Sequence, residues 1–108
     1  MKPSDELAAR IRPLLPQTGI TERNMFGAVC FMLDGNMLVA AMKGGELLVR
    51  TPPDRAEWAL SQEGAGTMQM GSRDMTGFVA INTEATGGDS IARWLAFAEP
   101  FVRSLPPK

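Results

Sequence analysis

The feature that most constrains the fold is a pair of apolar runs joined by an aspartate-glycine turn. Residues Ala28–Leu33 and Met37–Met42 are almost entirely apolar, and Asp34-Gly35-Asn36 lies between them. Such a turn is typical of a β-hairpin, because type I′ geometry needs positive φ at both central residues and glycine adopts that without steric cost. Since nearly every residue of both runs is apolar, we expect both faces to be covered, with helices packed on the hairpin.

Helices are predicted before the hairpin, in the middle of the chain and at its end. The first begins at the N-cap residue Ser4 and ends near Arg12, because Pro13 lacks the N–H that a continuing helix needs. The last begins near Asp89 or Ser90, and its apolar residues fall on one face at helical periodicity. That face consists of Ile91, Trp94, Leu95, Ala98, Phe101, Val102 and Leu105.

Further strands follow the hairpin. Leu47–Arg50 continues it as an antiparallel meander, with Leu47 and Val49 on one face. Gly27, just before the hairpin, indicates a bulge or a close backbone approach. Thr21–Asn24 lead into a short first strand at Met25-Phe26, and Thr51-Pro52-Pro53-Asp54 starts a short helix. A loop over Glu63–Ser72 follows, with a short strand at Thr67–Met70, and then a strand over Met75–Asn82. This order predicts an α+β fold: a mostly antiparallel sheet flanked by N-terminal, middle and long C-terminal helices, in a single domain over residues 1–108.

Charge and residue usage argue against several functional classes. The chain has 11 basic and 12 acidic residues, and this balance argues against nucleic-acid binding, because clustered Lys and Arg must neutralise the phosphates. It contains no His and no Tyr, so the commonest general base and Cys/His zinc sites are missing. No apolar run approaches the roughly 20 residues that span a bilayer, and the first residues lack the apolar core of a signal peptide. The single cysteine, Cys30, suits a reducing cytoplasm, and its place in mid-strand favours inert core packing over an exposed redox sensor.

Two groups of side chains are candidates for ligand or partner contacts. Arg50 and Arg73 can converge on an anion, or else lie at the surface with carboxylate partners such as Asp54 or Asp74. The long glycine-bearing loop after the middle helix carries three methionines, which suit an adaptable contact surface and equally fill irregular cores. These methionines are Met68, Met70 and Met75.

Four runs of residues carry a family resemblance. They are the stretch from Arg23 to Met37, Leu47-Leu48-Val49-Arg50, Met75-Thr76-Gly77-Phe78-Val79, and the stretch from Trp94 to Lys108. In this order the chain resembles short, single-domain members of the TfoX N-terminal domain family over essentially its whole length. The resemblance implies an α+β fold of the secretion-chaperone-like type and supplies no catalytic residues. It implies a link to DNA uptake only for two-domain competence regulators, whose second domain lies beyond the point where this chain ends. This chain also departs from the family pattern at Gly27-Ala28, where many members have two glycines.

The sequence thus predicts a small cytoplasmic, non-enzymatic regulatory or adaptor domain that acts through protein contacts. No two acids are placed in the sequence so that one would raise the pKa of the other, the usual mark of acid–base chemistry, and this argues against an enzyme. We also expect no cofactor and no metal. Generous apolar content and sheet edges favour self-association as a homodimer. The alternative is a small-molecule domain that holds an anion with Arg50 or Arg73, in a pocket between the sheet and the C-terminal helix. Direct DNA binding is the weakest hypothesis, because the charge balance opposes it.

Overall fold

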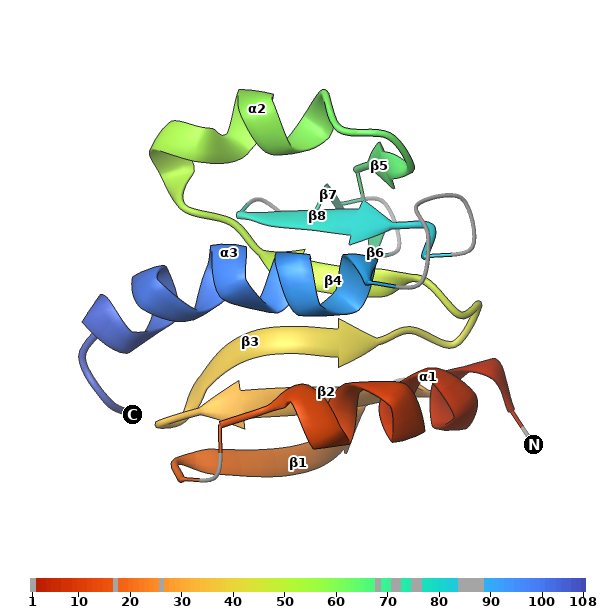
Figure 1. Cartoon of the computed structure of the whole chain (residues 1–108), viewed down its shortest axis with the longest axis vertical. Coiled ribbons are helices and arrows are strands. Elements are labelled where there is room, and N and C mark those ends of the chain that lie inside the picture. The colour runs from red at the N-terminus through yellow and green to blue at the C-terminus, as the bar shows by residue number, and fades with distance from the viewer. Residues whose placement is uncertain are drawn as a thin grey trace.

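The computed structural model describes residues 2–16, 18–25, 27–67, 69–70, 73–74, 77–83 and 89–108, with the backbone alone for 69–70 and 73–74. The strands are β1 (Ile20–Met25), β2 (Ala28–Leu33), β3 (Asn36–Ala41), β4 (Leu47–Arg50), β5 (Ala65–Gly66), β6 (Gln69–Met70), β7 (Arg73–Asp74) and β8 (Phe78–Ile81), and the helices are α1 (Pro3–Ile11), α2 (Ala56–Leu60) and α3 (Ser90–Ser104). Within these residues the strands form an antiparallel six-stranded sheet in the order β1-β2-β3-β4-β8-β5, and β6 pairs with β7. Figure 1 shows α1 and α3 lying across one side of the sheet. The predicted α+β fold is confirmed.

The central hairpin forms where the sequence predicts it. Asp34 and Gly35 have φ of 52° and 84°, which is the pair of positive values that a type I′ turn requires. β3 begins at Asn36, one residue earlier than predicted, so the turn holds two residues. The register shifts between Phe31 and Met32, which indicates a bulge inside the hairpin.

Gly27 has a different role from the one predicted. It lies between β1 and β2, where Met25 pairs with Ala28, and its φ is 80°. The glycine therefore belongs to the tight turn of a second hairpin, and the prediction of a bulge at this position is wrong. A local pattern could not show this, because the pairing of β1 along its whole length decides it.

The first helix also differs at its start. α1 begins at Pro3 with Lys2 as its N-cap, and Ser4 is buried in the first turn. Proline is well suited to this position, because the first N–H of a helix has no intrahelical partner. The helix ends at Ile11 and a 3₁₀ turn covers Arg12–Leu14, as Pro13 predicts.

The middle of the chain was predicted less closely. β8 is shorter than the predicted strand, and Met75 lies outside the described residues. The short strand predicted at Thr67–Met70 corresponds to β6, while Met68 lies outside the described residues. β5 was not predicted at all, because its two residues read as loop.

All three helices pack on the same face of the sheet. Their buried side chains join those of alternate strand residues, such as Phe31 and Val49, in one large core. The opposite face carries a smaller cluster of Ala28, Cys30, Ala40 and Leu48. Half-buried side chains pack against this smaller cluster: Met25, Met32, Met37, Met42 and Phe78. The side chains of the hairpin are thus buried on both faces, as expected, but the helices pack on only one of them.

The last residues of the chain return to the hairpin turn. The side-chain amide of Asn36 donates to the carbonyl of Pro106 at 3.0 Å, and the N–H of Lys108 donates to the carbonyl of Asp34 at 2.9 Å. Figure 1 shows the C-terminus next to the turn between β2 and β3. The end of α3 is therefore fixed against the central hairpin. Among the described residues, no helix has the length and apolarity that crossing a membrane requires.

Candidate functional site

The structure separates the site residues that the sequence singled out. The guanidinium of Arg50 lies over the rings of Phe78 at 5.3 Å and Phe101 at 5.9 Å, and within the described residues it has no carboxylate partner. Arg73 lies in β7 and Met70 in β6, but their side chains, like the whole of Met68 and Met75, lie outside the described residues. The convergence of Arg50 with Arg73 therefore stays a prediction.

Cys30 lies in the smaller cluster, on the sheet face without helices. Its side chain is only 3% exposed, and burial raises the pKa of its thiol. Both features lower the fraction of reactive thiolate. The position therefore supports the prediction of an inert, packed cysteine.

The most distinctive surface feature is a group of three aromatic rings between α2 and α3. Trp58 of α2 lies 6.0 Å from Trp94 and 5.1 Å from Phe97, and the two α3 rings meet edge to face at 5.3 Å. Trp94 is only 7% exposed, whereas Trp58 is 44% exposed. Together with Gln62, Glu63 and Arg93, the three rings line a cleft of about 360 Å³. We call this feature the aromatic cleft.

A cation stacks over the aromatic cleft. The guanidinium of Arg55 lies 4.7 Å from the centre of the Trp58 ring and 5.5 Å from that of Phe97. An arginine placed in this way is attracted by the negative faces of the rings, and its stem covers apolar surface. Arg55 is exposed, so those of its N–H groups that do not face the rings remain available to a carboxylate or carbonyl.

Local hydrogen bonds hold Trp58 in place. The hydroxyl of Ser61 donates to the Trp58 carbonyl at 2.6 Å, and the amide of Gln62 donates to the same oxygen at 3.1 Å. The same carbonyl also accepts the backbone N–H of Ser61 at 3.1 Å, so three donors meet at one oxygen near the end of α2. The short helix therefore presents its tryptophan from a fixed backbone.

The sequence pattern places Trp94 on the apolar face of the last helix, but it singles out neither Arg55 nor Phe97. A signal was available, because Arg55 precedes Trp58 by three residues and Trp94 precedes Phe97 by three. On a helix this spacing puts two side chains on neighbouring surface positions. That the two pairs face each other follows only from the packing of α2 and α3 on one side of the sheet.

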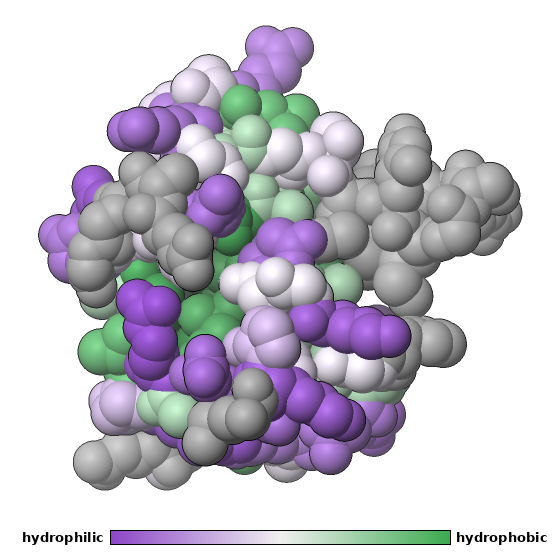
Figure 2. All heavy atoms as spheres, turned by 90° about the vertical axis from the view of Figure 1, so that its right-hand side faces the viewer, coloured by the Kyte–Doolittle hydropathy of each residue, from purple (hydrophilic) through white to green (hydrophobic). Residues whose placement is uncertain are grey.

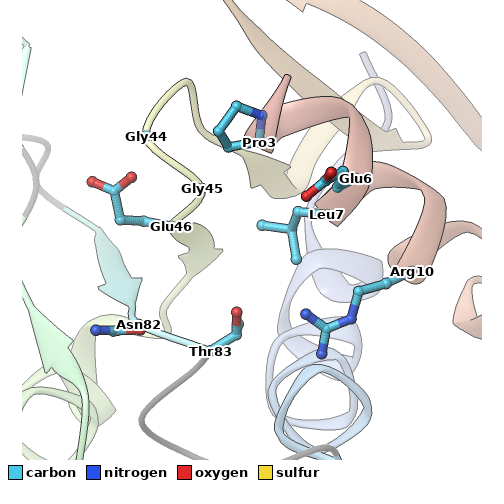
Figure 3. Close-up of a pocket in the computed structure, with 9 residues that line it drawn as sticks. All are labelled: Pro3, Glu6, Leu7, Arg10, Gly44, Gly45, Glu46, Asn82 and Thr83. Atoms are coloured by element: carbon cyan, nitrogen blue, oxygen red, sulfur yellow. The ribbon is translucent and has the colours of Figure 1, made fainter. Parts of the chain in front are cut away.

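A second recess lies at the opposite end of α1 from the hairpin turn. Its volume is about 530 Å³, and its lining residues are Pro3, Glu6, Leu7, Arg10, Gly44, Gly45, Glu46, Asn82 and Thr83. Figure 2 faces this end of the molecule and shows hydrophobic atoms at the floor of a hollow, with hydrophilic side chains around it. In Figure 3, Glu46 and Arg10 lie on opposite sides of this recess, with Leu7 between them.

The chemistry of the recess is less specific than that of the aromatic cleft. One oxygen of Glu46, Oε1, is buried and has no hydrogen-bond partner among the described residues, and a Cβ on Gly44 would collide with it. Glu6 and Arg10 are exposed, so water solvates both charges. Across the described residues, no three His, Cys, Asp or Glu side chains gather as a metal site would require. We therefore take the aromatic cleft as the candidate site.

The comparison with known proteins gives one match. The model of a family described as the TfoX N-terminal domain matches residues 13–99 of the 108-residue chain. No curated protein and no solved structure matches the chain. The matched range covers the sheet, α2 and most of α3, and it therefore includes the whole aromatic cleft.

Proposed function

This chain belongs to the TfoX N-terminal domain family, and from that premise we propose that it is a small, non-enzymatic regulatory or adaptor domain that acts by binding another protein. We further propose that it works in the cytoplasm, where its single, buried cysteine stays reduced. The contact surface in this proposal is the aromatic cleft.

One observation carries the proposal: Trp58 is 44% exposed although two more rings and a stacked arginine lie within 6.0 Å of it. Tryptophan and arginine are the residues most enriched among the energetic centres of protein interfaces. Polar side chains surround these rings, since Gln62, Glu63 and Arg93 also line the cleft. An apolar centre within a polar rim is the usual anatomy of a protein-contact surface.

Residue usage and the site chemistry support the non-enzymatic part of the proposal. The chain has no His and no Tyr, and Cys30 carries a raised thiol pKa, which opposes a nucleophilic role. Glu22 has a lowered pKa, because Arg12 hydrogen-bonds to it. A general acid needs the opposite shift.

The proposal is tested by exchanging Trp58 for alanine. A tagged chain is expressed in its native host, and the protein that co-purifies with it is identified, purified and titrated against the wild-type and variant chains. We expect Trp58→Ala to weaken binding by about 2 kcal/mol, or roughly thirtyfold, because the residue lies at the centre of the contact.

Leu60→Ala is the matched control. Leu60 is 42% exposed on the same helix, but it lies about 200° around the helix axis from Trp58. Binding by this variant should equal that of the wild type. Equal affinity of the Trp58→Ala variant and the wild type for the purified partner, with both variants folded by circular dichroism, would refute the aromatic cleft as the contact surface.

A further inference from the structure

We propose that the partner at the aromatic cleft is a second copy of this chain, docked about a twofold axis so that Arg55 of each copy meets the partner's Glu63. This inference rests on the proposed function, because it names the partner of the same surface. It starts from the order of chemical groups along one short segment.

The segment presents a cation, a ring and a carboxylate in that order. Arg55 stacks on Trp58, and Trp58 and Glu63 line the same cleft, so the three side chains share one surface. Arg55 and Glu63 are both exposed, and within the described part of the chain neither has an ion-pair partner. Arg55 lies just before α2 and Glu63 lies in the turn after it, so the two charges flank the short helix that carries Trp58.

A surface with opposite charges at its two ends is complementary to itself in one orientation. Turning a second copy by 180° about an axis that is perpendicular to this surface and passes between Arg55 and Glu63 places each arginine opposite the partner's glutamate. Contacts of this kind are isologous and close as a dimer. The edge of the stacked Arg55 guanidinium can then donate two parallel bonds to the partner's carboxylate.

The same orientation covers the exposed ring. Trp58 lies between Arg55 and Glu63 in the sequence and on the same surface, so the two Trp58 side chains meet near the centre of the contact. There the two rings cover each other, and each loses much of its 44% exposure. The contact then has one ion pair at each end and two tryptophans in the middle. Stable protein contacts show this arrangement of a polar rim around an apolar centre.

The free edge of β1 is a poorer route to a dimer. A twofold axis perpendicular to the sheet leaves the same face of both copies on the same side of the joined sheet. Two residues that pair directly across the new strand contact must therefore have their side chains on the same face. Two registers meet this condition and pair most of β1. One sets Glu22 opposite the partner's Glu22, and the other sets Arg23 opposite the partner's Arg23. Like charges directly opposite each other are unfavourable. Glu22 is also already bonded to Arg12 by two contacts of 2.9 Å.

Charge reversal tests the proposal on the full chain. The dissociation constant of the dimer is measured by sedimentation velocity at low salt for the wild type, Arg55→Glu, Glu63→Arg and the double variant. We expect each single reversal to weaken self-association about tenfold or more, and the double variant to recover to within about threefold of the wild type. Glu57→Arg is the control, because Glu57 is exposed in α2 between the two reversed charges but is not among the residues that line the cleft.

Fluorescence gives a second readout. The chain has two tryptophans, Trp58 and Trp94, and both line the cleft. Emission should therefore shift to shorter wavelength as concentration rises, with the same midpoint as sedimentation. A wild-type chain that stays monomeric at millimolar concentration overturns the dimer. The dimer is also overturned if the double variant associates no more tightly than either single variant. If that monomer still needs Trp58 to bind a different protein, the proposed function stands without the dimer.

Discussion

Gly35 meets two separate requirements at one position. Its φ of 84° completes the hairpin turn, and the backbone of Lys108 approaches so closely that a Cβ would collide with its carbonyl oxygen. The first requirement is local, and the aspartate-glycine pair predicts it. The second comes from the far end of the chain, so no pattern near the turn could have indicated it.

Replacing this glycine should therefore be costly. Gly35→Ala forces an L side chain into the left-handed region and displaces the last residue of the chain. We expect a loss of about 2 kcal/mol in the free energy of unfolding, and a fall in Tm of roughly 10 °C. Thermal melts followed by circular dichroism measure this.

Gly66→Ala is the control at the residue scale. Within the described part of the chain, a Cβ at Gly66 meets no atom within 4 Å, so the cost of this replacement should stay within about 0.5 kcal/mol. If the two variants melted at the same temperature, the close approach of Lys108 would not contribute to stability.

Among the elements, the 3₁₀ turn after α1 and the edge strand β1 are joined by one ion pair. Arg12 donates to both carboxylate oxygens of Glu22 at 2.9 Å. This hydrogen bonding holds the pKa of Glu22 below its usual value of 4.5. A carboxyl with a lowered pKa in the folded state stabilises the fold above pH 4.5 and loses that contribution as pH falls below it.

Glu22→Gln should therefore change stability in a pH-dependent way. At neutral pH the variant should melt slightly below the wild type, since exposed pairs contribute little. The difference should vanish as the pH falls through the folded-state pKa of Glu22, because the wild-type carboxyl is then neutral as well. Melting curves from neutral pH to about pH 3 measure this; a gap that persists at the acid end contradicts the ion-pair explanation. Glu57→Gln, which removes no ion pair among the described residues, is the control.

Helix α2 shows why an element can be predicted while its role is not. The prolines before it and its short apolar stretch predict a helix, and the structure has one there. Its ring contacts depend on where α3 lies, however, and α3 is placed by its own packing on β3 and β4. The aromatic cleft is therefore a property of two elements that are about 30 residues apart in the chain.

For the whole molecule, the return of the chain end to the central hairpin joins two parts of the sequence that lie 70 residues apart. Asn36 is 3% exposed, and its side-chain amide reaches the carbonyl of Pro106. Asn36→Ala should reduce the free energy of unfolding by about 1 to 2 kcal/mol, because a shielded carbonyl loses its donor. Urea denaturation measures the loss, and amide exchange at Lys108 should become faster.

Asn24→Ala is the matched control for this prediction. Asn24 is exposed in β1 and makes no side-chain hydrogen bond within the described residues. Its replacement should leave stability within about 0.5 kcal/mol of the wild type. Equal losses in the two variants would mean that the contact between the chain end and the turn contributes nothing measurable.

The sheet also shows what a burial pattern leaves open. Two fully apolar strands predict that both faces are buried, and the small cluster around Cys30 and Leu48 is buried as expected. On that face, however, methionines and Phe78 pack where a second layer of helices was expected. Long, flexible methionine side chains can bury small neighbours without another layer, so apolarity alone does not reveal the number of layers.

By itself the sequence determined the hairpin, the helical segments and the α+β class, because turn geometry and hydrophobic period are set by residues near one another. It also limited the chemistry, since a chain without His and Tyr lacks the common catalytic bases. Only the tertiary structure decided that β8 lies between β4 and β5, that all helices share one face, and that Arg55, Trp58, Trp94 and Phe97 meet. These features depend on contacts between distant segments, and local residue preferences do not encode them.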